Sequence, residues 1–98
     1  MKQITNATEI PTEGKVILDF YTDSCVGCKQ IEPLLKFIEA KYTDITFLKI
    51  DCDNCDPQIL TDYSIQAIPC IIEVNNTERV SKKSGKLECQ EFLQDLHI

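Results

Sequence analysis

Two cysteines with the spacing of a redox pair, Cys25 and Cys28, lie in the first third of the chain. Thiols separated by two residues (CVGC) can close reversibly into a small disulfide loop, and they can also supply two ligands to a metal ion. The pair lies between an apolar, strand-like segment, residues 15–22, and a helix-like segment. A helix N-terminus stabilises a negative sulfur through its unpaired N–H groups. The spacing and the junction together predict redox chemistry, whereas the spacing alone would also fit a pair of metal ligands or a chance occurrence.

A second pair with the same spacing, Cys52 and Cys55, directly follows another apolar segment, residues 45–51. The carboxyl ends of neighbouring parallel strands meet at one edge of an α/β sheet, so we expect all four thiols at that edge. Three aspartates surround the second pair and are expected to raise its thiol pKa values: Asp51, Asp53 and Asp56. We rank incidental or weakly redox-active thiols first and a regulatory second disulfide next. A zinc site built with Cys25 and Cys28 ranks last, and no metal is predicted.

The composition limits the remaining function classes. A chain of 98 residues fits a single domain, residues 1–98. The formal net charge of −6 argues against a nucleic-acid or anionic-membrane surface, because phosphate binding needs a basic patch. The first residues lack the apolar stretch of a secretory signal, and no apolar segment is long enough to span a bilayer. We therefore expect a cytoplasmic monomer in which the six cysteines are thiols, some of them catalytic.

Hydrophobic patterning predicts the elements that position the first pair. Residues 15–22, 45–51 and 70–74 are apolar enough for strands buried on both faces. Apolar positions from Cys28 to Tyr42 follow helical spacing, so a helix is expected there, with Ser24 as its N-cap and a kink at Pro33. Further elements are predicted in four places: a weak strand at 2–5, a short helix from Asp56-Pro57 to Tyr63, a hairpin strand at 78–81, and a last helix after Gly85.

This order of elements predicts an α/β fold with a mixed central sheet. Strand–helix–strand alternation implies parallel pairing with a right-handed crossover, and the closing hairpin adds antiparallel strands. Cys25 is expected in the first helical turn and is therefore our candidate attacking thiolate. Cys28, one turn deeper, is the candidate resolving thiol. Cys70 and Cys89 lie at apolar positions of the third strand and last helix and are expected to be buried and structural.

The chain resembles the thioredoxin family over nearly its whole length. The resemblance rests on anchors that keep the family's register around the CVGC segment: Asp19 inside the first long strand, Pro33 five residues after Cys28, Ile68-Pro69 before the third core strand, and Gly85 before the last helix. It implies a thioredoxin-like fold, with helices on both faces of the sheet. It also implies a protein-disulfide oxidoreductase with no bound cofactor, recharged by an external thioredoxin-reductase-type donor and acting on client proteins that contain disulfides.

The resemblance also suggests roles for residues around the pair. Asp19 is expected to be a buried acid with a raised pKa that relays the proton of Cys28. Pro69 is expected to be cis, turning the backbone of Ile68 toward the CVGC segment so that it can pair with an extended substrate.

The chain departs from the family pattern beside the cysteines. It contains no tryptophan, and Ser24 stands where thioredoxins carry that residue. Val26 and Gly27 replace the usual Gly-Pro and are expected to tune the site. Phe47 is assigned to the position where many members have a lysine near the buried acid, so the pKa of Asp19 is expected to rise further than in those members.

Three other interpretations stay open. A glutathione-linked enzyme resembling glutaredoxin is the nearest enzymatic alternative. A thioredoxin-fold binding module without turnover is an alternative of another class, because the changes beside the cysteines leave room for lost catalysis. A zinc-binding protein that uses both cysteine pairs is the third.

Overall fold

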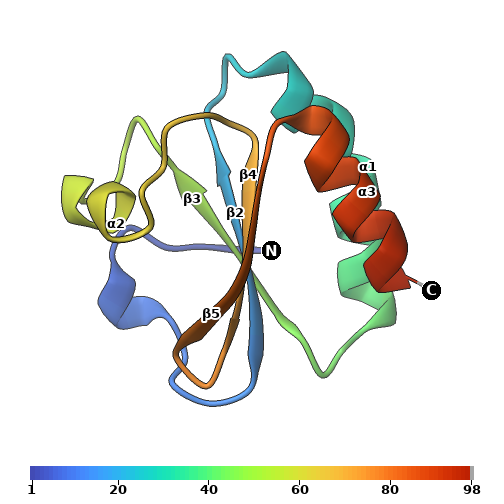
Figure 1. The fold of residues 1–98 in the computed structure, drawn as a ribbon, viewed down its shortest axis with the longest axis horizontal. Coiled ribbons are helices and arrows are strands. Elements are labelled where there is room, and N and C mark those ends of the chain that lie inside the picture. The colour runs from blue at the N-terminus through green and yellow to red at the C-terminus, as the bar shows by residue number, and fades with distance from the viewer. Residues whose placement is uncertain (98) are drawn as a thin grey trace.

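The computed structural model describes residues 1–97, which form a five-stranded mixed sheet with helices on both faces (Figure 1). The strand order is β1-β3-β2-β4-β5. The strands are β1 (Lys2–Gln3), β2 (Lys15–Tyr21), β3 (Thr46–Asp51), β4 (Cys70–Asn75) and β5 (Glu78–Ser84). The helices are the short 3-10 helix η1 (Ala7–Glu9), α1 (Val26–Lys41), α2 (Pro57–Asp62) and α3 (Lys86–His97). The predicted α/β fold with a mixed sheet is confirmed.

The long strand β2 lies at the centre of the sheet and carries the first cysteine pair at its carboxyl end. It pairs parallel with β3 and antiparallel with β4, and β4 forms an antiparallel hairpin with β5. The parallel neighbours follow from the helical crossover α1, as the alternation of elements predicted. The short edge strand β1, predicted as a weak strand, pairs parallel with β3.

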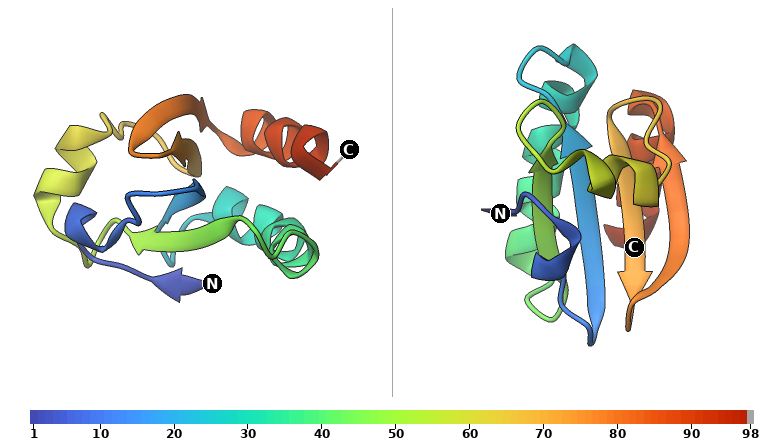
Figure 2. Two further views of the ribbon diagram at one scale, coloured as in Figure 1. Left: turned by 90° about the horizontal axis from the view of Figure 1, so that it is seen from below. Right: turned by 90° about the vertical axis from the view of Figure 1, so that its left-hand side faces the viewer.

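Side chains of β2 alternate between two separate cores. Val16, Leu18 and Phe20 face the core beneath η1 and α2, whereas Ile17 faces the core beneath α1 and α3. Figure 1 shows α1 and α3 together on one side of the sheet and α2 on the other, and Figure 2 shows the same layers from two further directions. Asp19 therefore points toward α1 and α3, the layer that carries the cysteines.

Two elements differ from the expectations. The helix η1 was not predicted, because its three residues lack an apolar period. Its ends are held locally instead: the Asn6 side chain accepts from the Thr8 N–H, and Glu9 accepts from the Asn6 N–H. Strand β5 extends to Ser84 rather than to residue 81, although much of it is exposed. Within residues 1–97, no helix combines the length and apolar character needed to cross a membrane.

Candidate active site

The first cysteine pair forms a disulfide at the start of α1. Cys25 and Cys28 are bonded to each other, and their Cα atoms are 5.3 Å apart. The Cys28 N–H donates to Cys25 Sγ at 3.1 Å, so Cys25 occupies the N-cap position of α1. A backbone donor aimed at this sulfur stabilises its negative charge when the disulfide is opened. The site can therefore generate a thiolate at Cys25.

One detail of the predicted helix start was wrong. The helix begins at Val26, and its N-cap is Cys25 rather than Ser24. The sulfur accepts the bond that a serine oxygen was expected to accept. The Ser24 hydroxyl lies 3.4 Å from the Thr22 hydroxyl, outside the cap. As predicted, the helical segment continues through Pro33 rather than ending there.

The two sulfurs differ in their access to solvent. Cys28 is buried, with 7% of its surface exposed, whereas Cys25 is only partly buried. Val26, the next residue after Cys25, is 68% exposed. A client can therefore reach Cys25 more easily than Cys28, in agreement with the expected order of burial along the helix.

Asp19 is the buried acid of the site. Only 8% of its surface is exposed, and its Oδ1 atom has no hydrogen-bond partner among the described residues. Burial raises the pKa of this carboxyl from an ordinary value of 3.8 to about 7. The charge of Glu32 adds to this rise, and the charge of Lys49 opposes it. A carboxyl with such a pKa can both accept and donate a proton near neutral pH.

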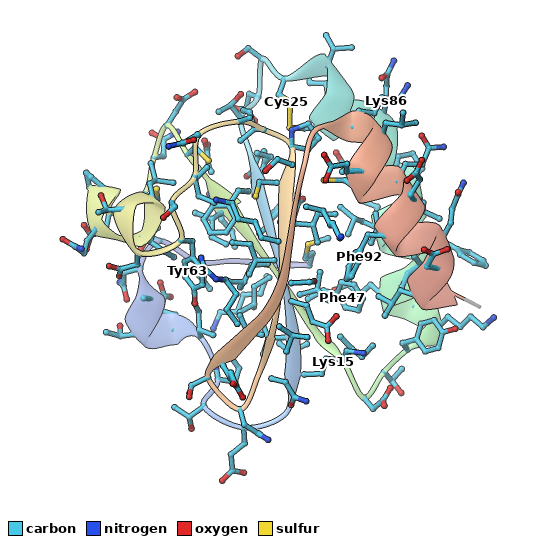
Figure 3. All side chains as sticks on the ribbon, viewed as in Figure 1. Lys15, Cys25, Phe47, Tyr63, Lys86 and Phe92 are labelled. Atoms are coloured by element: carbon cyan, nitrogen blue, oxygen red, sulfur yellow. A yellow bond between two sulfur atoms is a disulfide. The ribbon has the colours of Figure 1, made fainter. Side chains whose placement is uncertain are left out.

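The basic residue near Asp19 is present, contrary to the expectation that Phe47 had taken its place. Lys49 is in register with Asp19 across the β2–β3 pair, whereas Phe47 is in register with Ile17. Phe47 is buried in the core beneath α1 and α3, where Phe92 also packs (Figure 3). The expectation of a missing cation is therefore wrong, because a lysine lies two residues after Phe47, on the same face of β3. Lys49 lowers the pKa of Asp19, so the missing cation on which the expected extra rise depended is present after all.

A small cavity connects the buried acid with the resolving cysteine. Its volume is about 140 Å³, and its lining includes Asp19, Cys28 and Lys49. Glu32 and Lys36 of α1 line it as well. A polar cavity of this size can admit water, so protons can pass between solvent and Asp19. The geometry therefore supports proton exchange beside Cys28.

The Ile68–Pro69 peptide bond is cis, as expected, and it lies beside the CVGC segment. A Cβ atom added to Gly27 would lie 3.3 Å from Pro69 Cδ, closer than most side-chain contacts. No hydrogen bond to the backbone of Ile68 is found within residues 1–97. Its N–H and C=O are thus available to pair with an extended chain next to the disulfide.

Comparison with known proteins identifies the chain. Residues 2–97 match the family model for thioredoxin. The chain belongs to the thioredoxin family. It is 34% identical over 101 residues to thioredoxin from Mycoplasmoides gallisepticum, covering 96% of this chain and all of that protein. It is 30% identical over 80 residues to thioredoxin from Chlamydia trachomatis, covering 82% of this chain and 78% of that protein. It superimposes on oxidised mitochondrial thioredoxin 3 from Saccharomyces cerevisiae with a TM-score of 0.82 and 26% identity, over 97% and 94% of the two chains.

Membership of the thioredoxin family and the Cys25–Cys28 disulfide together make the protein a thiol–disulfide oxidoreductase. Thioredoxins carry out this chemistry with the disulfide itself and need no bound cofactor. They act on client proteins that contain disulfides. The glutaredoxin-like alternative is not supported, because the family match is to thioredoxin over nearly the whole chain.

The second cysteine pair of this thioredoxin-family protein is a pair of free thiols. The Cys52 N–H donates to Tyr21 O at 2.8 Å, which places Cys52 at the carboxyl end of β2, as predicted. Burial raises the pKa of the Cys52 thiol to about 11, and burial also raises the pKa of Cys55. Nearby aspartates add to both shifts, as expected, but burial is the larger cause. These thiols are poor nucleophiles in the folded protein.

The structure gives the zinc alternative no support. Among residues 1–97, no three His, Cys, Asp or Glu side chains are arranged to hold a metal ion. Two of the four sulfurs that the alternative requires, those of Cys25 and Cys28, are already bonded to each other. Asp51 instead organises the loop that contains Cys52, because its carboxylate accepts from the Asp53 N–H and the Asn54 side chain.

The remaining cysteines are buried, as predicted. The Cys89 thiol donates to Lys83 O at 3.3 Å and to Pro69 O at 3.5 Å. The Gly85 N–H also donates to Pro69 O, at 2.8 Å. These contacts tie the start of α3 to the cis-proline segment. Cys70 is fully buried, and its sulfur accepts from the Ser84 hydroxyl at 3.6 Å.

Sequence reasoning missed the residue that packs against the CVGC segment from α3. A Cβ atom on Gly27 would lie 3.3 Å from Lys86 Cβ, so Gly27 permits a close approach between the starts of α1 and α3. Figure 3 shows Cys25 and Lys86 at the same end of the molecule. The sequence signal was the position of Lys86, directly after Gly85, but no local pattern connects it with Gly27. The expectation for Gly27 was that it tunes the site, and the structure adds close packing as a reason for a glycine.

Proposed function

We propose that this protein reduces disulfides of client proteins in the cytoplasm, with Cys25 as the attacking thiolate and Cys28 as the resolving thiol. The observation that carries the proposal is the arrangement around the disulfide. An accessible sulfur at the helix N-cap is bonded to a buried sulfur, and the buried sulfur shares a cavity with Asp19, a buried acid whose Oδ1 atom has no hydrogen-bond partner within residues 1–97.

In the first step, the Cys25 thiolate attacks one sulfur of the client disulfide. A mixed disulfide forms between Cys25 and the client, and the other client sulfur leaves as a thiolate. The N–H of Cys28 and the N-terminus of α1 stabilise the Cys25 thiolate before the attack. The backbone of Ile68 beside Pro69 supports pairing with the client segment that carries the disulfide.

In the second step, Cys28 resolves the mixed disulfide. Its thiol gives a proton to the Asp19 carboxylate, and the resulting thiolate attacks Cys25 Sγ. The Cys25–Cys28 disulfide forms, and the second client sulfur leaves as a thiolate. The client has then gained two electrons. A reductase of the thioredoxin-reductase type returns two electrons to the Cys25–Cys28 disulfide, which gives the protein its part in electron transport.

The cellular setting is part of the same proposal. Cys52, Cys55, Cys70 and Cys89 are free thiols, which supports a reducing compartment such as the cytoplasm. The protein is proposed to act as a monomer, without a nucleic-acid or membrane partner, since its net charge of −6 opposes both surfaces. Cell fractionation with an antibody to the protein tests the compartment, and recovery in a membrane or secreted fraction would contradict it.

Insulin reduction with trapping variants tests the chemistry. The wild-type protein is expected to reduce insulin in a Cys25-dependent manner. The Cys28→Ser variant is expected to accumulate a mixed disulfide with insulin through Cys25, because the resolving thiol is missing. The Cys25→Ser variant should accumulate none. Cys55→Ser is the matched control, because it removes a thiol of the second pair, and it should retain wild-type turnover.

Two results would contradict the proposal. A mixed disulfide that forms through Cys28 in the Cys25→Ser variant would reverse the two roles. Insulin reduction that does not depend on Cys25, or no reduction at all, would favour the binding-module alternative. Asp19→Asn tests the relay separately: the release of client from the mixed disulfide is expected to slow and to lose its dependence on pH near neutrality.

A further inference from the structure

A second acidic side chain, Glu32, lines the cavity that contains Asp19 and Cys28. Glu32 is on α1 four residues after Cys28, and residues four apart share one face of a helix. Its side chain is half exposed, whereas Asp19 is buried. Glu32 therefore lies on the solvent side of the cavity and Asp19 on the protein side.

Lys36 forms an ion pair with the carboxylate of Glu32. Lys36 is one turn further along α1 than Glu32, and its Nζ atom lies 2.9 Å from Glu32 Oε1. The hydrogen bond from Lys36 lowers the pKa of Glu32, so Glu32 carries its negative charge at neutral pH. A negative charge therefore lies beside a cavity that leads to a buried acid.

Asp19 is faced by charged or titratable groups from several elements. They are Cys28, Lys29, Glu32 and Lys36 of α1, Lys49 of β3, Tyr21 and Asp23 at the end of β2, the terminal residue Met1, whose ammonium pairs with Glu39, and the buried thiols Cys70 of β4 and Cys89 of α3. After burial, the strongest influences on the pKa of Asp19 are the charges of Glu32 and Lys49. Glu32 raises this pKa, and Lys49 lowers it.

We propose that Glu32 is a positioning residue for the proton transfer at Cys28, acting through Asp19. Its negative charge opposes the positive charge of Lys49, so that Asp19 keeps a high affinity for the proton that Cys28 releases. This inference rests on the proposed function, in which that proton moves from Cys28 Sγ to the Asp19 carboxylate. Without the charge of Glu32, Lys49 acts unopposed and Asp19 becomes a weaker base.

The variant Glu32→Gln tests this inference, because it removes the charge and keeps the size of the side chain. The titration of Asp19 is followed by carbon-13 NMR of its carboxyl, in the oxidised and in the reduced protein. Its midpoint is expected to fall by about half a pH unit at low salt. The pH midpoint of client release from the mixed disulfide should fall by a similar amount. Lys49→Met should move both midpoints upward.

Glu91→Gln is the matched control. It removes the same charge from an exposed position on α3, away from this cavity, and should leave both midpoints unchanged. Because Glu32 is half exposed, added salt should reduce the shift that Glu32→Gln produces.

The inference is overturned if the Asp19 midpoint in Glu32→Gln stays in place or rises. It is also overturned if client release slows equally at every pH while its midpoint is unchanged, since that result indicates a purely structural role. The NMR titration requires no turnover, so its result is independent of the insulin assay. Absence of Cys25-dependent turnover in the wild-type protein would refute the proposed function and would leave the titration as a separate measurement.

Discussion

Replacing Asp19 by asparagine is expected to stabilise the folded protein at neutral and alkaline pH, with little effect near pH 4. Burial raises the pKa of Asp19 from 3.8 to about 7. Between these values, the folded protein retains a proton that the unfolded chain has released, so the wild-type protein loses stability as the pH rises. The loss is complete above the folded-state pKa. Asparagine cannot ionise, and the variant therefore avoids this loss.

The size of the effect follows from the two pKa values. A rise of about three units corresponds to about 4 kcal/mol of unfolding free energy at about pH 8, since each unit contributes about 1.4 kcal/mol. By the same relation, the loss of unfolding free energy in the wild-type protein is about 2 kcal/mol at about pH 5 and less than about 1 kcal/mol at about pH 4. A packing difference between asparagine and the protonated acid adds a constant to the difference in unfolding free energy between the variant and the wild-type protein. This constant does not vary with pH.

Urea unfolding of the oxidised protein, repeated across this pH range, measures the difference. Circular dichroism is the suitable probe, because the chain contains no tryptophan. The matched control is Asp44→Asn, which changes an exposed carboxyl and should show no such pH-dependent gain. A difference in unfolding free energy between Asp19→Asn and wild type that is the same at every pH would refute the reasoning, as would a difference that moves against the variant as the pH rises.

Three further predictions concern packing and reactivity. Gly27→Ala is expected to raise the KM for insulin several-fold, since the new Cβ lies 3.3 Å from Pro69 Cδ; an unchanged KM would contradict this. Leu35→Ala should lower the unfolding free energy by about 2–5 kcal/mol in urea titrations, because Leu35 is fully buried; a change well below this range would show that the core is not closely packed there. Cys70 and Cys89 should resist iodoacetamide until the protein unfolds, since burial raises the pKa of both thiols; rapid labelling of the native protein would disprove this.

Local patterns were sufficient for most of the fold. The apolar segments that became β2, β3 and β4 were recognisable because strands buried on both faces need nearly continuous apolar side chains. The end of β5 was missed for the opposite reason. Its residues are mostly polar, and pairing with β4 rather than burial keeps Lys82, Lys83 and Ser84 in the strand.

The error at Lys49 shows where local patterns are insufficient. Asp19 and Lys49 are on different strands joined by a helix, and only the register between β2 and β3 decides which residue lies beside the acid. The one basic residue within the apolar segment 45–51 was visible in the sequence. The alignment of Lys49 with Asp19 was not visible, because the register joins two segments that are far apart in the chain.

The sequence by itself determined the kind of chemistry, because the CVGC spacing, a helix start and the family anchors are properties of residues close together in the chain. The tertiary structure decided the surroundings in which that chemistry takes place. The pKa of Asp19 depends on its burial between the sheet and the helices α1 and α3. It also depends on the opposed charges of Glu32 and Lys49, which come from different elements. The need for a glycine at Gly27 arises from the approach of Lys86 in space. Electrostatic and steric effects act through distance in space, and the chain sequence records only distance along the backbone.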